Sequence, residues 1–215
     1  MSLYVSAAQG GSFEPRKPIE AGAYAAICDM VVDLGVQPSP GGQFAPKRTV
    51  VLRFQIPEIR VEITRDGKTE SLPAVISRTV GLSLNEKSTL YALLTSWRGK
   101  AFTADELKKF DLGKIAGKPA FINVTHSVKG DRTYANLTSI MPLPKAIPAP
   151  KLEGEALVYS TDESDPDTFD KLPTWMQDKI AARIVDAPKP AAKPSAAAAA
   201  AGQSDESFAD SDMAF

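Results

Sequence analysis

Candidate cationic and aromatic side chains come from four places in the sequence: a proline- and glycine-rich loop, two segments of alternating apolar residues, and a tight turn with the residues that follow it. They are Phe44, Lys47, Arg48, Arg53, Arg78, Lys129, Arg132 and Tyr134. Lysine and arginine bind phosphates, and aromatic faces stack on planar bases at about 1–3 kcal/mol per base. Each cation taken singly is an ordinary solvated charge. These residues can form a binding surface for a polyanion that carries bases only if the fold brings them to one face.

The composition offers few of the residues that usually carry out catalysis. The chain has one histidine, His126, and one cysteine, Cys28. Together they exclude a Cys/His zinc site, and a single cysteine cannot form a disulfide within the monomer and suits a reducing compartment. One histidine gives no pattern that identifies a Ser/His/Asp set. We therefore expect no enzymatic activity, no metal and no cofactor.

Charge is divided unequally along the chain. Residues 1–150 hold 19 Lys and Arg against 13 Asp and Glu, whereas residues 151–215 hold 6 against 13. A basic body followed by an acidic tail indicates a polyanion-binding surface and a segment that competes with the polyanion or recruits a basic partner. The alternative is that the asymmetry only favours solubility.

Alternating apolar residues predict five strands, at residues 22–35, 49–63, 72–82, 120–128 and 134–141. In the first, the even-numbered residues from Tyr24 to Leu34 are apolar and include Cys28, so we expect one buried face with Asp29 and Asp33 on the other. In the second, the alternation shifts by one residue after Pro57, which predicts a bulge. Asp66-Gly67 predicts the hairpin that leads into the third strand.

The period changes to that of a helix between the third and fourth strands. Ser83 and Glu86 have the spacing of a capping box, and a helical stripe of Leu90, Leu93, Leu94 and Trp97 follows, ending at Gly99. Trp97 is expected in the core. A second box at residues 103–106 predicts a short helix ending near Phe110. His126 alternates with apolar neighbours and is expected to be a half-buried structural residue.

This order of elements is that of an OB-fold, the partly open five-stranded Greek-key barrel with a helix between strands 3 and 4. A β-sandwich is the alternative, since short alternating strands do not fix topology. The expected organisation is a flexible N-terminal arm (residues 1–18), the OB-fold domain (19–145), an acidic segment with a short amphipathic helix (146–186), an Ala/Pro-rich linker (187–203) and an acidic tip (204–215). Trp175, Met176, Ile180 and Ile184 lean to one side of the helix, which would dock on the barrel or on a partner.

The segments STLYALLTSWRGKAFTADEL, GKPAFINVTHSVKGDRTYANLTSIMPLP and LPTWMQDKI resemble phage-encoded single-stranded-DNA-binding proteins of replication and recombination modules. The resemblance covers most of residues 20–184. It implies sequence-independent binding and protection of single-stranded DNA during phage replication or recombination. The DNA-binding candidates are the eight cationic and aromatic residues named above.

The last residues, SDESFADSDMAF, form an acidic tip on a tether rich in alanine and proline. The tip is similar to that of bacterial and phage single-stranded-DNA-binding proteins, which replication and repair enzymes recognise, and Asp210, Asp212 and Phe215 are the matching positions. Met213 and Ala214 depart from the usual apolar residue and proline. The resemblance implies replication or recombination proteins as partners of the tip. The sequence leaves open whether the protein is a monomer or a dimer.

Two further expectations concern location and the competing function. No apolar stretch is long enough to cross a membrane, and the N-terminus shows no basic segment followed by an apolar run. We therefore expect a protein of the cytoplasm, that of the bacterial host if it is phage-encoded. The alternative function is a non-enzymatic adaptor or structural phage protein whose β-barrel binds protein rather than DNA.

Overall fold

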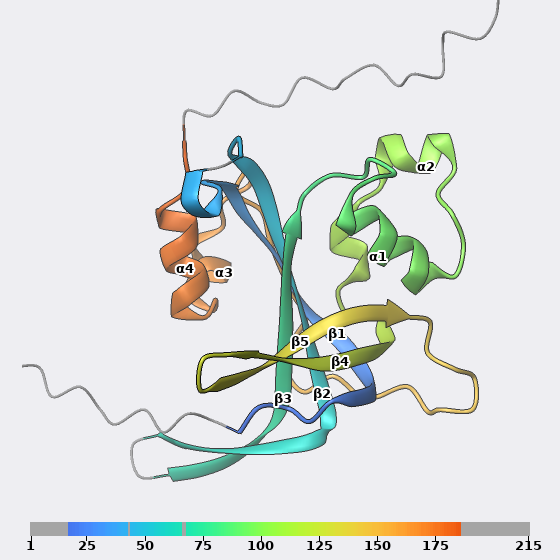
Figure 1. Ribbon diagram of the computed structural model, residues 1–215, viewed down its shortest axis with the longest axis vertical. Helices are drawn as coiled ribbons and strands as arrows, with labels where there is room; N and C mark the ends of the chain where they lie inside the picture. The colour runs from blue at the N-terminus through green and yellow to red at the C-terminus, as the bar shows by residue number, and fades with distance from the viewer. Residues whose placement is uncertain (1–16, 43, 66–67, 186–215) are drawn as a thin grey trace, which may run out of the picture. The chain divides into compact units, whose positions relative to one another are not determined.

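The computed structural model describes residues 17–42, 44–65 and 68–185, and these are mainly β-structure (Figure 1). The strands are β1 (Gly22–Gln37), β2 (Lys47–Arg65), β3 (Lys68–Gly81), β4 (Pro119–Lys129), β5 (Arg132–Met141) and β6 (Leu157–Tyr159). The helices are α1 (Thr89–Arg98), α2 (Ala104–Lys109), α3 (Pro166–Asp170) and α4 (Thr174–Ala181), with 3₁₀ turns at Pro40–Gly42 and Leu112–Ile115.

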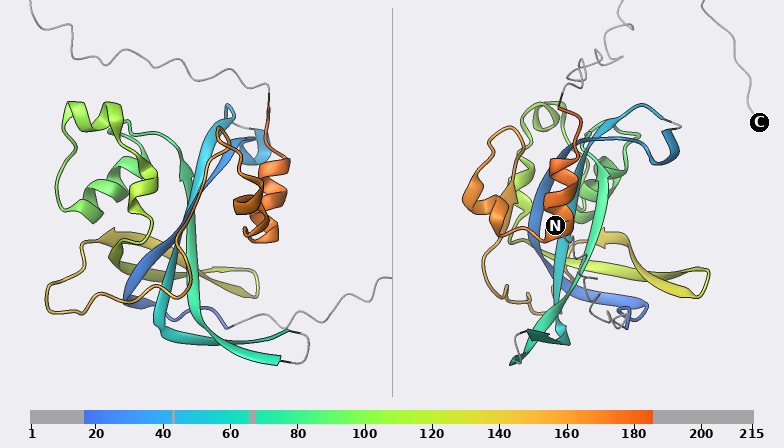
Figure 2. Two further views of the ribbon diagram at one scale, coloured as in Figure 1. Left: turned by 180° about the vertical axis from the view of Figure 1, so that it is seen from behind. Right: turned by 90° about the vertical axis from the view of Figure 1, so that its left-hand side faces the viewer.

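Five strands form one antiparallel sheet in the order β3-β2-β1-β4-β5, which curls into a half-barrel (Figures 1 and 2). The end strands approach each other where Arg78 of β3 donates to the carbonyl oxygens of Leu137 and Thr138 of β5, at 2.7 and 2.8 Å. The expectation of five strands, with a helix between the third and the fourth, is confirmed. A sixth strand, β6, was not expected and pairs in parallel with Met30–Val32 of β1.

The predicted hairpin between the second and third strands and the predicted bulge after Pro57 are both confirmed. The pairing of β2 with β3 runs through to Arg65 opposite Lys68, on either side of the Asp-Gly pair, and its register shifts between Ile56 and Arg60, next to Pro57. A proline there removes a ladder donor, and the bulge bends the long strand so that the sheet can curl.

The expectation of a single buried face along β1 is wrong. The register shifts between Cys28 and Met30, leaving Asp29 as an extra residue, and it shifts again between Asp33 and Gly35. Each extra residue changes the alternation by one, so Met30 and Val32 face away from the side that holds Cys28. Asp29 and Asp33 were expected on a polar face, yet both are buried, because the outer side of the sheet is also covered.

The helix after β3 begins later than the sequence indicated. Ser88, not Ser83, is the N-cap, and its hydroxyl accepts from the Tyr91 N–H. Ser83 instead accepts, through its carbonyl, a hydrogen bond from the Ser88 hydroxyl. The expected C-terminus at Gly99 is confirmed, with φ at 68° where a glycine is unstrained. The capping box of α2 at Thr103 and Glu106 is also confirmed.

The inner apolar cluster fills the half-barrel and is sealed by α1. The four stripe residues Leu90, Leu93, Leu94 and Trp97 are all buried, as expected. Trp97 packs on Phe54 of β2 with ring centroids 5.4 Å apart, and its indole N–H donates to the Pro119 carbonyl. This cluster also holds Ala26, Cys28, Val31, Ile122 and Ile140.

The outer apolar cluster lies on the opposite side of β1 and β2 and joins residues beyond β5 to the sheet. Its strand residues are Met30, Val32, Leu34 and Val51, and they pack against Tyr159, Leu172, Met176 and Ile180. The Gln37 side chain also donates to the Lys179 carbonyl, and the Ile184 N–H to the Val36 carbonyl. The helix expected near residues 172–184 therefore docks on the curled sheet itself, and the packed structure continues past the expected boundary at residue 145.

Candidate functional site

The candidate residues on two hairpins are accessible to a ligand. Phe44, at 75% exposed, and Lys47 lie at the β1–β2 connection, whereas Lys129, Arg132 and Tyr134 lie on the β4–β5 hairpin, where Tyr134 is 44% exposed. In the right-hand view of Figure 2 both hairpins project on the same side of the sheet, one above the other. The structure thus leaves these five side chains free to meet a ligand that spans both hairpins.

Arg48 does not lie free on the surface. Its guanidinium contacts Asp33 at 2.6 Å and Asp162 at 2.8 Å. The Thr161 N–H and hydroxyl also donate to the Asp33 carboxylate, so this group ties β1 to the chain that follows β6. Burial alone would raise the pKa of Asp33, but the hydrogen bonds from Arg48, Thr161 and the Gly35 N–H outweigh it and hold that pKa below its usual range.

Arg53 is held in the same way by the extra residue of β1. Its Nη2 and Nε atoms donate to one oxygen of Asp29 at 2.6 and 2.9 Å, and Asp29 is 1% exposed. Gln55 adds a hydrogen bond to the same oxygen at 3.3 Å. A buried carboxylate needs such partners because an unpaired charge away from water is strongly unfavourable. The primary role that these contacts give Arg53 is to neutralise Asp29.

The eight candidates therefore divide by their contacts. Arg48, Arg53 and Arg78 are bonded to groups of the protein itself, and Arg78 closes the seam between β3 and β5. The other five are exposed on the two hairpins. Sequence spacing could not separate these two sets, because the carboxylates and carbonyls that bind the arginines come from residues up to 114 positions away.

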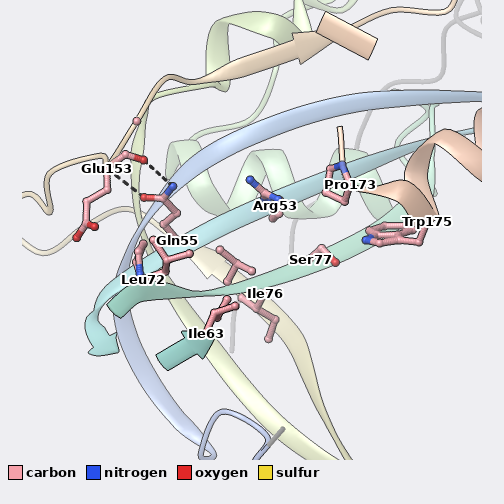
Figure 3. A pocket seen from close by; sticks show the side chains of 12 residues that line it. Arg53, Gln55, Ile63, Leu72, Ile76, Ser77, Glu153, Pro173 and Trp175 are labelled. Carbon is pink, nitrogen blue, oxygen red and sulfur yellow. Dashed lines mark hydrogen bonds between the residues drawn. The ribbon is translucent and has the colours of Figure 1, made fainter. Parts of the chain in front are cut away.

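An open groove of about 650 Å³ lies on the outer face of β2 and β3 (Figure 3). The side chains of Arg53 and Gln55 meet those of Val75 and Ser77 here, since these residues are paired across the two strands. Pro173 and Trp175 from the start of α4 form one wall (Figure 3). The opposite end is fixed by Gln55, which exchanges two hydrogen bonds with the backbone of Glu153, at 3.0 and 3.1 Å.

A second, larger hollow of about 1100 Å³ opens between β3 and β5. Its lining includes Tyr134 and Ala135 of β5, Tyr24 of β1, the cations Lys17 and Arg60, and the carboxylates of Glu20, Glu58 and Glu62. Both hollows are lined by the same β3 residues, Pro73, Val75, Ile76 and Ser77. The edge strand β3 therefore separates two adjoining recesses.

Trp175 is a site residue that the sequence did not single out. It was expected on the apolar side of its helix, yet it is 40% exposed, whereas Met176 and Ile180 are buried. The signal was present in the spacing. Met176 and Ile180 are four residues apart and share a face, and Trp175 lies about 100° around the helix from Met176.

The remaining reactive groups are structural. Cys28 is 0% exposed, and burial raises the pKa of its thiol well above the usual value, which suppresses the reactive thiolate. His126 is more exposed than expected, and its Nε2 donates to the Ile19 carbonyl at 2.7 Å. Within residues 17–42, 44–65 and 68–185, no three His, Cys, Asp or Glu side chains are grouped to hold a metal ion. Over the same residues, no helix is both long and apolar enough to cross a membrane.

The tip residues Asp210, Asp212 and Phe215 lie outside the described residues. No protein-family model matches the chain, and no curated protein matches its sequence.

Proposed function

We propose that this protein binds single-stranded DNA without reading its sequence, and protects it during phage DNA replication or recombination. The acidic tip, through Asp210, Asp212 and Phe215, recruits replication or repair proteins to the coated strand. The proposal involves no catalytic step, metal or cofactor.

The arrangement of the strands supports this proposal. The order β3-β2-β1-β4-β5, the approach of β3 to β5 and the position of α1 between β3 and β4 agree with an OB-fold. OB-folds bind oligonucleotides across the face of strands 2 and 3, between the loop that joins strands 1 and 2 and the loop that joins strands 4 and 5. The observation that carries the proposal is that the open groove of this protein lies on that face, on the outer side of β2 and β3.

The exposed candidates provide the two kinds of contact that non-specific strand binding needs. Lys47, Lys129 and Arg132 supply positive charge for phosphates, while Phe44 and Tyr134 offer rings on which bases stack. Arg48 and Arg53 both lie on β2, but they act chiefly by neutralising the carboxylates of Asp33 and Asp29. In this proposal the two arginines stabilise the DNA-binding face of the sheet and contribute less to direct contacts with the DNA.

The test is a binding titration of the full chain with a labelled oligo-dT, compared with duplex DNA and single-stranded RNA, over a range of salt. We expect oligo-dT binding whose log affinity falls linearly with log salt, with a slope of about −0.7 per neutralised phosphate. The double variant Lys129→Glu/Arg132→Glu should weaken binding ~10-fold or more and flatten that slope, because it removes two phosphate contacts.

A matched control is Lys108→Glu/Lys109→Glu, which changes the net charge equally at exposed sites that line neither hollow. These residues belong to α2, which lies on the other side of the sheet from α4 (Figure 1). This variant should bind as the unmodified protein does. No binding of oligo-dT at low salt would contradict the proposal and favour a barrel that binds protein. An equal loss in both variants would show that only overall charge matters.

A further inference from the structure

We propose that Trp175 is a base-stacking residue, and that the bound strand crosses β3 from the outer groove at Trp175 to the second hollow at Tyr134. This inference rests on the proposed function. It adds a binding residue from α4, a helix outside the five strands, and it assigns a path to the nucleic acid.

The two tryptophans of the chain have opposite environments. Trp97 is 8% exposed, packs on Phe54 and donates its indole N–H to Pro119. Trp175 is 40% exposed and faces the outer groove (Figure 3). A large aromatic ring left accessible beside a groove is an available stacking surface, while the ring of Trp97 is already occupied.

The backbone that carries Trp175 is fixed by the packing of its helix. Met176 and Ile180 are 0% and 2% exposed and anchor α4 on β1, and Leu172 immediately before the helix is 4% exposed. Pro173 precedes the first turn and has a restricted backbone. A rigid platform loses little conformational entropy when a base stacks on it, which favours binding.

The floor beneath this platform has room for a flat ligand. On β3 it is made by Val75 and Ser77, which have short side chains. The one long cation on the floor, Arg53, is held against Asp29 and so is prevented from folding onto the indole. A groove of about 650 Å³ falls within the range of roughly 300–1,000 Å³ that is usual for ligand pockets.

The path across β3 follows from the shared lining. Pro73, Val75, Ile76 and Ser77 border both hollows, and an exposed aromatic residue stands in each, Trp175 in one and Tyr134 in the other. A strand of nucleic acid that passes over this edge can stack one base on each ring.

A single-stranded nucleic acid suits this edge better than an added β-strand does. A peptide that extends a sheet needs a row of backbone donors and acceptors along the edge strand. Pro73 lies within the shared stretch and has no N–H to offer. Bases require only ring faces, with positive charge nearby for the phosphates. The exposed cations Lys129 and Arg132 lie on the same hairpin as Tyr134 and can supply that charge.

The chain provides its own spectroscopic test, since it has only two tryptophans. Oligo-dT should quench the tryptophan fluorescence of the unmodified protein through Trp175. Trp175→Phe should lose most of the quenching, because the remaining Trp97 is buried, and should weaken binding only a few-fold since a ring remains. Trp175→Ala should weaken binding about 5- to 150-fold, the equivalent of one lost stack.

Met141→Ala, at a partly exposed apolar side chain outside both hollows, is the control and should bind as the unmodified protein does. Thermal unfolding of each variant checks that the fold is retained. Tyr134→Ala should weaken binding further in the Trp175→Ala background if one strand contacts both rings. If Trp175→Ala binds oligo-dT as tightly as the unmodified protein and Trp175→Phe is still quenched, the assignment is wrong while the proposed function stands. If the unmodified protein does not bind oligo-dT, both fail.

Discussion

The two sides of the β1–β2 sheet hold two apolar layers of different construction. The inner layer is enclosed by the half-barrel and α1, and its large residues, such as Phe54 and Leu94, are almost completely buried. The outer layer is smaller, and β6, α3 and α4 cover only part of the sheet, so that the groove at Trp175 stays open beside it.

Buried charge also distinguishes the two layers. Asp29 and Asp33 are neutralised by Arg53 and Arg48. The hydrogen bond that Thr161 donates to Asp33 and the one that Asp162 accepts from Arg48 link this pairing to the covering segment. Such pairs contribute little net stability compared with apolar packing but make the loss of one partner unfavourable. The inner layer therefore accounts for most of the stability, whereas the outer layer defines how the covering segment sits and where the groove remains.

The largest expected effect comes from breaking the inner layer. Phe54→Ala removes a ring that is 0% exposed and packs on Trp97, and it should lower the free energy of unfolding by about 3–5 kcal/mol. Urea unfolding followed by circular dichroism measures this loss. Val128→Ala, at a side chain 70% exposed, is the control and should change stability by less than about 0.5 kcal/mol. Equal effects of the two changes would contradict the assigned core.

Breaking the outer layer should have a smaller and more local effect. Met176→Ala leaves a cavity beneath α4 and should lower stability by about 2–3 kcal/mol, at the low end for such changes because the covering helix can shift. In hydrogen exchange, amides of α4 and β6 should exchange faster while those of β2 and β5 keep their protection. Uniformly faster exchange throughout the sheet would mean that the two layers unfold as one unit.

The smallest effect concerns the charge that joins the outer layer to its cover. The pKa of Asp33 is lower in the folded than in the unfolded chain, so its ionised form stabilises the fold above about pH 4, the unfolded value. This contribution is lost as the pH falls through the folded pKa. Asp33→Asn should therefore lower stability at pH 7 by about 1–2 kcal/mol through weaker hydrogen bonds to Arg48 and Thr161.

The difference between Asp33→Asn and the unmodified protein should shrink as the pH falls below about 4, where the unfolded chain takes up the proton first, and should disappear below the folded pKa, where the aspartate is protonated in both states. Urea unfolding at several pH values measures it. A difference that stays constant down to pH 2 would show that the charge of Asp33 does not contribute.

Local signals in the sequence predicted much of the inner layer and missed the outer one. The stripe Leu90, Leu93, Leu94 and Trp97 and the stop at Gly99 were predictable because helix period and glycine geometry are local properties. The later N-cap at Ser88 was not, since several serines with similar spacing compete and the packing of the helix selects among them.

Prediction of the candidate binding site was limited in the same way, to features that depend on neighbouring residues. The exposed hairpin residues Phe44, Lys129 and Arg132 could be predicted from loop position and residue type. The contacts of Arg48 and Arg53 could not be predicted, because an arginine on a strand has the same local sequence pattern whether it binds a carboxylate of the protein or a ligand. Trp175 was missed because an aromatic residue next to an apolar helix face looks like part of that face until the docking angle is known.

The sequence by itself determined the succession of the five strands along the chain, the helix between the third and fourth, the bend after Pro57 and the separation of basic and acidic charge. These follow from side-chain period, turn chemistry and composition, which depend on neighbouring residues. Only the tertiary structure decided that Asp29 bulges from β1, that residues 157–180 return to cover the outer face, and that Trp175 stands free beside a groove. Those features depend on contacts between residues far apart in the chain, where the burial of charge and apolar surface selects one arrangement among many that the local pattern allows.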